Sequence, residues 1–141
     1  MDKTIKSIID IIKSCDDVQL CTFGLEEYPE TRHVMNGMNQ NIDSIALHFL
    51  TMKSSPKFKQ LEKNNHCCLY YFNPTTRYAV RLFGKMENID DQSEKNKYWQ
   101  DKYSNFGFTG ANDPNFALLR FIPDSYKFYI GEELYTGKIE Q

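Results

Sequence analysis

One stretch of the chain combines residue types and spacing that favour the binding of an anion. Residues 44–51 alternate as a strand does and run through Thr51 into a helix start with Ser55 as N-cap and Pro56 at the first helical position. Backbone N–H groups point outward at such a start, and the helix dipole favours negative charge. Thr51, Ser55 and Lys57 could add side-chain donors to a bound phosphate. Ser-Pro-Lys is also common at ordinary helix starts, so a structural role stays open for this motif.

A second cation lies in the strand predicted for residues 30–38. Arg32 stands between Thr31 and His33, so its side chain either belongs to a solvated face or points inward. An arginine makes planar, bidentate contacts to phosphate groups. Arg32 is therefore the residue to expect at a phosphate site, if the chain has one.

Other kinds of chemistry find little support in the sequence. There is no P-loop, no glycine-rich dinucleotide motif and no supported Ser-His-Asp set, and we expect no metal site because His33, His48 and His66 lack metal-ligand spacing. No catalytic side chain is identified. If the chain is an enzyme, a cofactor is expected to carry the chemistry.

The elements that must position these residues are predicted from hydropathy periodicity and turn residues. Helices are expected over residues 4–15 and 55–64 and from Asp91 onward, where Trp99, Tyr103 and Phe106 form an aromatic stripe that is typical of core or interface. A bulge or a close backbone approach is expected at Gly84. Strands are expected over residues 18–23, 30–38, 44–51, 66–72, 76–88, 116–122 and 125–130, with a polar tail from about residue 131.

Composition limits the class of protein. The 141 residues are expected to form one domain, 1–141, and the 10 Phe, 9 Tyr and 1 Trp favour a β-rich core, a ring-binding cleft or a subunit interface. A net charge of −2 without a basic stripe argues against nucleic acid and against a membrane surface. No targeting segment is recognised, so we expect a cytoplasmic protein, and its four cysteines are expected to be reduced: Cys15, Cys21, Cys67 and Cys68.

Short strands joined by turns predict a mainly antiparallel sheet closed into a small β-barrel with peripheral helices. The order of four segments over roughly residues 2–130 also resembles the pyridoxamine 5′-phosphate oxidase-like superfamily, and most closely its short general stress protein branch. The four segments are Thr31-Arg32-His33-Val34, Phe49-Leu50-Thr51, Ser55-Pro56-Lys57 and Val80-Arg81-Leu82-Phe83-Gly84-Lys85-Met86-Glu87. The resemblance implies a six-stranded antiparallel split β-barrel, a homodimer, and FMN held in a cleft at the dimer interface.

The resemblance also implies which residues hold the cofactor. Arg32 and Lys57 would contact the FMN phosphate, and Leu50, Thr51 and Ser55 match the strand end and the small hydroxyl position of the family motif. The residues after the arginine would run along the isoalloxazine ring and offer backbone groups to it: His33, Val34, Met35 and Asn36.

Three departures from the family pattern narrow the expected reaction. Pro56 stands where the true oxidase often has an arginine, Ala79 stands where it has a glutamine that contacts flavin, and its C-terminal substrate-binding segment has no counterpart here. We therefore do not expect pyridoxamine phosphate as the substrate. Haem-binding relatives use a C-terminal histidine, and no histidine follows His66, which argues against haem. A deazaflavin stays open as an alternative to FMN.

The preferred hypothesis is an FMN-dependent oxidoreductase that takes electrons from a nicotinamide donor and reduces a small electrophile such as a quinone or a nitro compound. The alternative is a non-catalytic flavin-binding or redox-sensing protein of the stress-response type. A third hypothesis is a barrel that has lost its cofactor.

Overall fold

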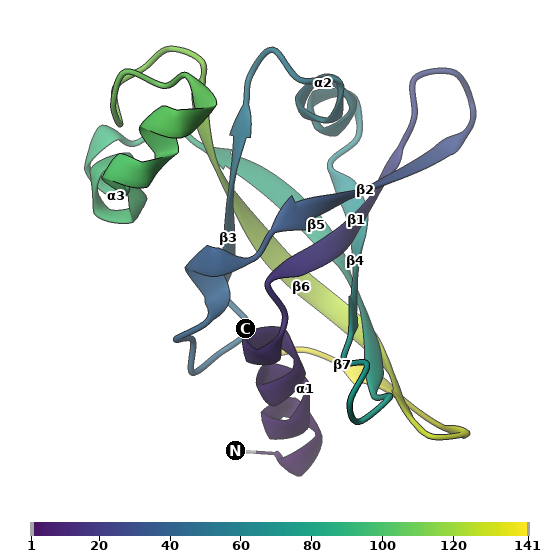
Figure 1. The fold of residues 1–141 in the computed structure, drawn as a ribbon. Helices are drawn as coiled ribbons and strands as arrows, with labels where there is room; N and C mark the ends of the chain where they lie inside the picture. Colours follow the sequence, from purple (N-terminus) through teal and green to yellow (C-terminus); the bar gives the residue numbers. More distant parts are fainter. Residues whose placement is uncertain (1, 141) are drawn as a thin grey trace.

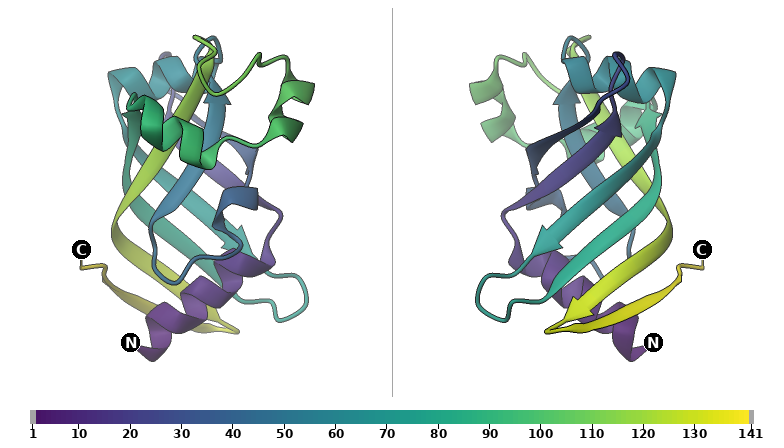
Figure 2. Two further views of the ribbon diagram at one scale, coloured as in Figure 1. Left: turned by 90° about the vertical axis from the view of Figure 1, so that its left-hand side faces the viewer. Right: turned by 90° about the vertical axis from the view of Figure 1, so that its right-hand side faces the viewer.

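Seven strands form one curved antiparallel sheet in a computed structural model that describes residues 2–140 (Figure 1). The order across the sheet is β2-β1-β4-β5-β6-β3, and β7 pairs with β6. The sheet curls until its edge strands β2 and β3 lie near each other, which is the split barrel expected from the sequence (Figure 2). The strands are β1 (Asp17–Phe23), β2 (Pro29–Met35), β3 (Leu47–Met52), β4 (His66–Phe72), β5 (Ala79–Ile89), β6 (Phe116–Ile130) and β7 (Glu133–Lys138).

Three α-helices, α1 (Lys3–Ser14), α2 (Pro56–Lys63) and α3 (Gln92–Tyr98), lie around the sheet in the described chain, together with two 3₁₀-helices, η1 (Gly37–Asn39) and η2 (Asp101–Phe106). The helices α1 and α2 lie at opposite ends of the barrel (Figures 1 and 2). Between residues 2 and 140, no helix is both long and apolar enough to cross a lipid bilayer.

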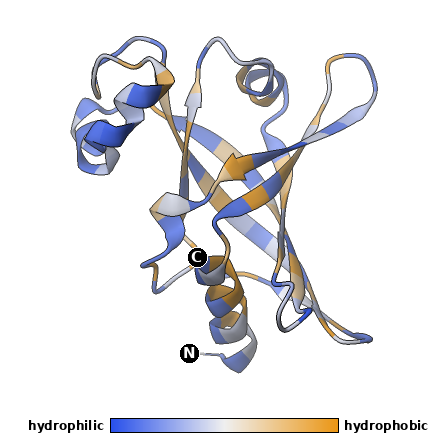
Figure 3. Cartoon of the chain, in the orientation of Figure 1, coloured by the Kyte–Doolittle hydropathy of each residue, from blue (hydrophilic) through white to orange (hydrophobic). Residues whose placement is uncertain are grey.

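The core fills the inside of the barrel because alternate strand residues point inward and the isoleucines of α1 close one end. Figure 3 shows this as apolar bands on the strands and an apolar stripe on α1. Its largest fully buried members from the strands are Leu20, Leu47, Phe49, Leu69, Tyr71, Leu82, Phe121 and Phe128. A second, smaller core lies under α3 and η2 and consists of Tyr103, Phe108 and Phe116, with Met38, Leu50 and Trp99 packed against it.

The bulge predicted at Gly84 is confirmed, because the β5–β6 register shifts between Phe83 and Gly84. A Cβ on Gly84 would lie 2.2 Å from the backbone oxygen of Ile122, so only glycine allows this close approach. The prediction of two strands, 116–122 and 125–130, is wrong. One long strand, β6, passes through Pro123 opposite Gly84. Proline has no N–H to donate to a ladder, and a bulge is where a strand tolerates this loss.

The chain after Gly131 differs from the polar tail expected there. It turns at Gly131, which has a φ of 60°, and returns as β7 along β6. Nearly every residue of β7 is exposed, so the strand has no buried apolar alternation for the sequence to reveal. Backbone pairing with β6 forms this strand, so the sheet has seven strands where the family resemblance implied six.

The helix α3 ends before the three residues of the predicted aromatic stripe, so the stripe does not lie on it. Asp91 is its N-cap as predicted, but the helix ends at Tyr98, and Trp99 is extended. Trp99 and Tyr103 nevertheless pack edge to face, with ring centroids 5.6 Å apart, in the second core. Phe106 is 42% exposed and lies outside that core. The prediction of core or interface is thus confirmed as core for Trp99 and Tyr103, and an interface role for Phe106 stays a prediction.

Other boundaries differ by a few residues. The strand β4 covers the predicted residues 66–72. The predicted strands 30–38 and 44–51 are shorter in the structure, since β2 ends at Met35 before η1 and β3 begins only at Leu47.

Candidate functional site

Arg32 points into the molecule, which decides between the two orientations that the sequence left open. Its Nη1 donates to the backbone oxygen of Leu20 at 3.0 Å and to Oγ1 of Thr22 at 2.8 Å. Its Nη2 donates to Oε1 of Gln60 at 2.9 Å. All these acceptors are neutral oxygens. Within residues 2–140 the salt bridges are Lys53–Asp90 and Arg120–Glu94, so the half-buried Arg32 has no acidic partner there.

Two of these partners were missed by the sequence analysis. Thr22 is 4% exposed and Gln60 is 3% exposed, and Oγ1 of Thr22 donates to Oε1 of Gln60 at 2.6 Å. Together they fix the guanidinium between β1 and α2. A signal was present in the sequence, because Thr22 follows Leu20 in the inward alternation of β1 and Gln60 lies beside the apolar Leu61 of α2.

Lys57 lies in the first turn of α2, close enough to Arg32 for the two charges to interact. Burial lowers the pKa of Lys57, and the positive charge of Arg32 lowers that pKa further. Burial also lowers the pKa of Arg32. Burial is the largest cause of both shifts, and for Arg32 it outweighs the nearby charge of Glu30, which raises that pKa. Both cations have therefore lost water without forming an ion pair in the described chain. A bound phosphate would supply the missing negative charge.

The start of α2 keeps its donors free of a side-chain cap. Ser55 has the extended backbone of an N-cap, as predicted, but its hydroxyl accepts no N–H from the helix. The Oγ of Ser55 instead lies 3.2 Å from Oγ1 of Thr51, at the end of β3. The first N–H groups of a helix have no partner within the helix, so these amides remain for a ligand. Thr51 is only 3% exposed, and its hydroxyl borders the site through its bond to Ser55.

The structure therefore brings Arg32, Thr51, Ser55 and Lys57 to one end of the barrel, around the start of α2. Two cations, two hydroxyls and a helix N-terminus can bind a dianion such as a phosphomonoester. Leu50 is not part of this group. Its side chain lies on the other face of β3 and packs against the second core.

The four residues after Arg32 differ in what they can offer to a ligand. His33 and Met35 are exposed on the edge strand β2, whereas Val34 points into the core. Because β2 is an edge strand, its outer edge can offer backbone groups to a planar ring.

Asn36 is fully buried and bonded within the protein. Its Nδ2 donates to the backbone oxygens of Ile12 and Cys15 at 2.8 and 2.7 Å, and its Oδ1 accepts from the hydroxyl of Tyr71 at 2.6 Å. Its backbone N–H donates to the oxygen of Asp16 at 2.8 Å. Asn36 thus ties the end of β2 to α1 and β4, which is a structural role.

A second polar cluster, also missed by the sequence analysis, lies under α3. His48 is 5% exposed, its ring stacks on Tyr98 with centroids 4.1 Å apart, and its Nε2 accepts from Nε of Arg120 at 3.1 Å. Arg120 in turn lies 3.4 Å from the carboxylate of Glu94. Burial, and then the charge of Arg120, lower the pKa of His48 to about 4, so its ring is neutral at neutral pH. We name these four residues the His48 cluster.

No group of three or more His, Cys, Asp or Glu side chains in the described chain is arranged to hold a metal ion.

Comparisons with known proteins now add to this geometry. The family model described as "Pyridoxamine 5′-phosphate oxidase like" matches residues 3–133. A search of curated proteins finds no match. Among solved structures, a protein related to general stress protein 26 from Clostridium acetobutylicum is 25% identical, with a TM-score of 0.84 over 99% of this chain and 97% of that chain.

Two more distant structures share the fold. A pyridoxamine 5′-phosphate oxidase-related, FMN binding protein from Nostoc punctiforme PCC 73102 is 18% identical, with a TM-score of 0.69 over 98% of this chain and 96% of that chain. A heme binding protein from Mycobacterium smegmatis is 12% identical, with a TM-score of 0.74 over 98% of this chain and 59% of that chain.

Proposed function

This chain belongs to the pyridoxamine 5′-phosphate oxidase-like family, and we propose that it binds FMN and acts as an oxidoreductase on a small electrophilic acceptor. The observation that carries the proposal is the pair of half-buried cations, Arg32 and Lys57, beside the uncapped start of α2. Neither cation forms an ion pair with a carboxylate in the described chain.

The residues present fit the two ends of FMN. The phosphate carries nearly two negative charges, which Arg32, Lys57 and the amides of α2 would balance. The ring would lie along the free edge of β2, over His33 and Met35. Arg32 enters this arrangement already oriented by Thr22 and Gln60, so little side-chain entropy would be lost on binding.

A second copy of the chain would complete the ring site. The hairpin between β1 and β2 carries apolar side chains that are unusually exposed for such large groups: Phe23 at 57%, Leu25 at 48% and Tyr28 at 75%. Exposed apolar patches of this kind are typical of subunit interfaces. We therefore propose a homodimer that encloses the cofactor between its two chains.

FMN, when bound, would supply transfer of one or two electrons between a nicotinamide donor and an acceptor such as a quinone or a nitro compound. The chain would bind the phosphate, orient the ring against β2 and keep water from one of its faces. No side chain of this chain is assigned a role as acid or base. Flavin binding without turnover is the second candidate function, and it uses the same residues.

The first experiment is the visible absorption spectrum of the purified protein, before and after incubation with excess FMN and desalting. We expect a retained flavin spectrum that bleaches with NADH or NADPH and returns when a quinone is added. A retained spectrum that no donor bleaches would support the second candidate instead. A protein that retains no flavin would contradict both.

Single substitutions then test the residues. Arg32→Ala and Lys57→Ala should each weaken FMN binding by about 1.5–3 kcal/mol, the typical worth of a hydrogen bond to a charged group. Lys59→Ala is the matched control, because Lys59 is an exposed cation on the same helix. FMN affinity that is unchanged in both site variants would remove the assignment.

A further inference from the structure

Two of the four free cysteines face each other across neighbouring strands. Cys21 of β1 is the register partner of Cys68 of β4 in an antiparallel pair. Directly opposed residues of such a pair have Cα atoms about 4.5–5.5 Å apart, and a disulfide needs about 4.4–6.8 Å. The register therefore puts the Cα atoms of these two cysteines within the range that a disulfide can span.

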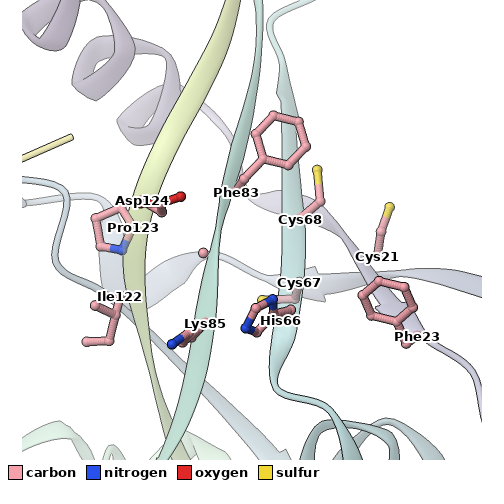
Figure 4. Close-up of a pocket in the computed structure, with 11 residues that line it drawn as sticks. Cys21, Phe23, His66, Cys67, Cys68, Phe83, Lys85, Ile122, Pro123 and Asp124 are labelled. Carbon is pink, nitrogen blue, oxygen red and sulfur yellow. The ribbon is translucent and has the colours of Figure 1, made fainter. Parts of the chain in front are cut away.

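Both side chains also leave the sheet on the same face. Figure 4 shows Cys21 and Cys68 projecting from adjacent strands with their sulfur atoms pointing the same way. Both are partly exposed. Cys67, the next residue along β4, is only 8% exposed and belongs to the core, because successive strand residues point to opposite faces.

The two thiols line one cleft on the outside of the barrel, with a volume of about 650 Å³, and the mostly buried Cys67 also borders it. Phe23 and Phe83 form part of its wall (Figure 4). None of the residues named for the phosphate site lines it, so it is a separate place in the molecule. In the single chain the cleft is open to solvent, which gives a small oxidant access to both sulfur atoms, although its Phe23 also belongs to the surface proposed for the homodimer.

We propose that Cys21 and Cys68 are a redox-active pair that forms a reversible intrachain disulfide when the protein meets a peroxide. The sulfur of Cys21 attacks hydrogen peroxide, the O–O bond breaks, and a sulfenic acid and water result. The sulfur of Cys68 then attacks the sulfur of Cys21, the S–O bond breaks, and the hydroxide leaves with the proton of Cys68 as a second water. In sum, two thiols and one peroxide give one disulfide and two waters.

The order of the two steps follows from the surroundings of the thiols. Burial, and then the charge of Cys21, raise the pKa of Cys68 to about 11, so Cys68 is a protonated thiol at neutral pH. The thiolate is the form that reacts with peroxide. The Sγ of Cys21 lies 3.4 Å from Oγ1 of Thr31 in an exposed contact, whereas the Sγ of Cys68 lies 3.9 Å from the backbone oxygen of Leu69 in a partly buried one. We therefore assign the first step to Cys21, the more accessible sulfur.

The other two thiols serve as built-in controls. Burial raises the pKa of Cys67 to about 12, and its side chain points into the core. Burial also raises the pKa of Cys15, which is buried and donates to the backbone oxygen of Phe72 at 3.5 Å. The inference does not depend on flavin, so it can stand if the proposed function fails.

The test is to treat the purified protein with a small excess of hydrogen peroxide, to alkylate the remaining thiols under denaturing conditions and to measure the mass. We expect two of the four thiols to be protected and a mass 2 Da lower before alkylation, with reversal by dithiothreitol. No loss of thiols, or a covalent dimer on a non-reducing gel in place of the intrachain bond, would overturn the proposal.

Variants identify the bonded pair, because trypsin leaves Cys15 with Cys21 in peptide 14–32 and Cys67 with Cys68 in peptide 64–77. The cross-link should vanish in Cys21→Ala and Cys68→Ala and persist in Cys15→Ala and Cys67→Ala. Should a variant fail to fold, a protease that cleaves before Asp17 separates Cys15 from Cys21 in the unaltered protein. A cross-link that maps to Cys15 or Cys67 would contradict the assignment.

Discussion

Arg32 and Arg120 are both half-buried on strands, and each reaches across to a helix, yet they end on different groups. Arg32 reaches α2 and ends on the neutral oxygen of Gln60 at 2.9 Å. Arg120 reaches α3 and ends on the carboxylate of Glu94 at 3.4 Å. In the first arrangement the arginine forms no ion pair in the described chain, and in the second it forms one. Charge balance, more than burial, separates a candidate anion site from a structural cluster here.

The residues next to each arginine show the same contrast. The charge of Arg32 lowers the pKa of Lys57, which adds a second cation to the site. The charge of Arg120 lowers the pKa of His48, which keeps that ring neutral as an acceptor. The site around Arg32 and Lys57 thus contains two cations, while the His48 cluster contains one cation and one carboxylate.

The largest expected effect comes from removing both cations of the unbalanced site. Arg32→Ala/Lys57→Ala should weaken FMN binding by about 3–6 kcal/mol if the two losses add. Titration of the variant with FMN, followed by quenching of flavin fluorescence, measures this loss. The unaltered protein should prefer FMN over riboflavin, which lacks the phosphate, and the double variant should have lost most of that preference. A double variant that still distinguishes FMN from riboflavin would place the phosphate elsewhere.

The next effect concerns the His48 cluster and appears as a pH dependence of folding. The pKa of His48 is about 4 in the folded protein, and the ordinary value of 6.5 applies in the unfolded chain. The unfolded chain therefore binds more protons between pH 4 and pH 6.5. The contribution of neutral His48 to the free energy of unfolding should therefore be complete above pH 6.5 and be lost as the pH falls toward 4, by up to about 3 kcal/mol. Urea unfolding at several pH values measures this slope.

Two variants separate the contribution of His48 to this slope from that of the carboxylates, which titrate in the same pH range. His48→Gln should flatten the slope, whereas His66→Gln should leave it unchanged, because His66 is exposed at the start of β4. An equal slope in both variants would mean that His48 does not carry the effect.

The smallest effect on stability is expected when the His48 cluster loses its carboxylate. Glu94→Gln keeps the shape of the side chain and leaves Arg120 without a counter-charge, at a cost of about 1 kcal/mol of unfolding free energy for a partly exposed pair. FMN affinity should stay within twofold of the unaltered protein. A large loss of FMN affinity would show that the His48 cluster and the phosphate site are coupled, and would contradict their separate roles.

The sequence predicted more of the fold than of the site. The alternation of β4, the cap of α3 and the bulge at Gly84 follow from neighbouring residues and appear as expected. The strand β7 could not be predicted in the same way, because its residues are almost all exposed and only pairing with β6 makes it a strand.

By itself, the sequence determined which segments alternate, where helices begin and which cations stand near a helix start, since these depend on residues within a few positions. Only the tertiary structure decided that Arg32 points inward onto Gln60, that His48 meets Arg120, and that Cys21 faces Cys68. Each of these contacts joins residues at least 28 positions apart, so it exists only after the sheet has fixed its register and burial has removed the water around the side chains.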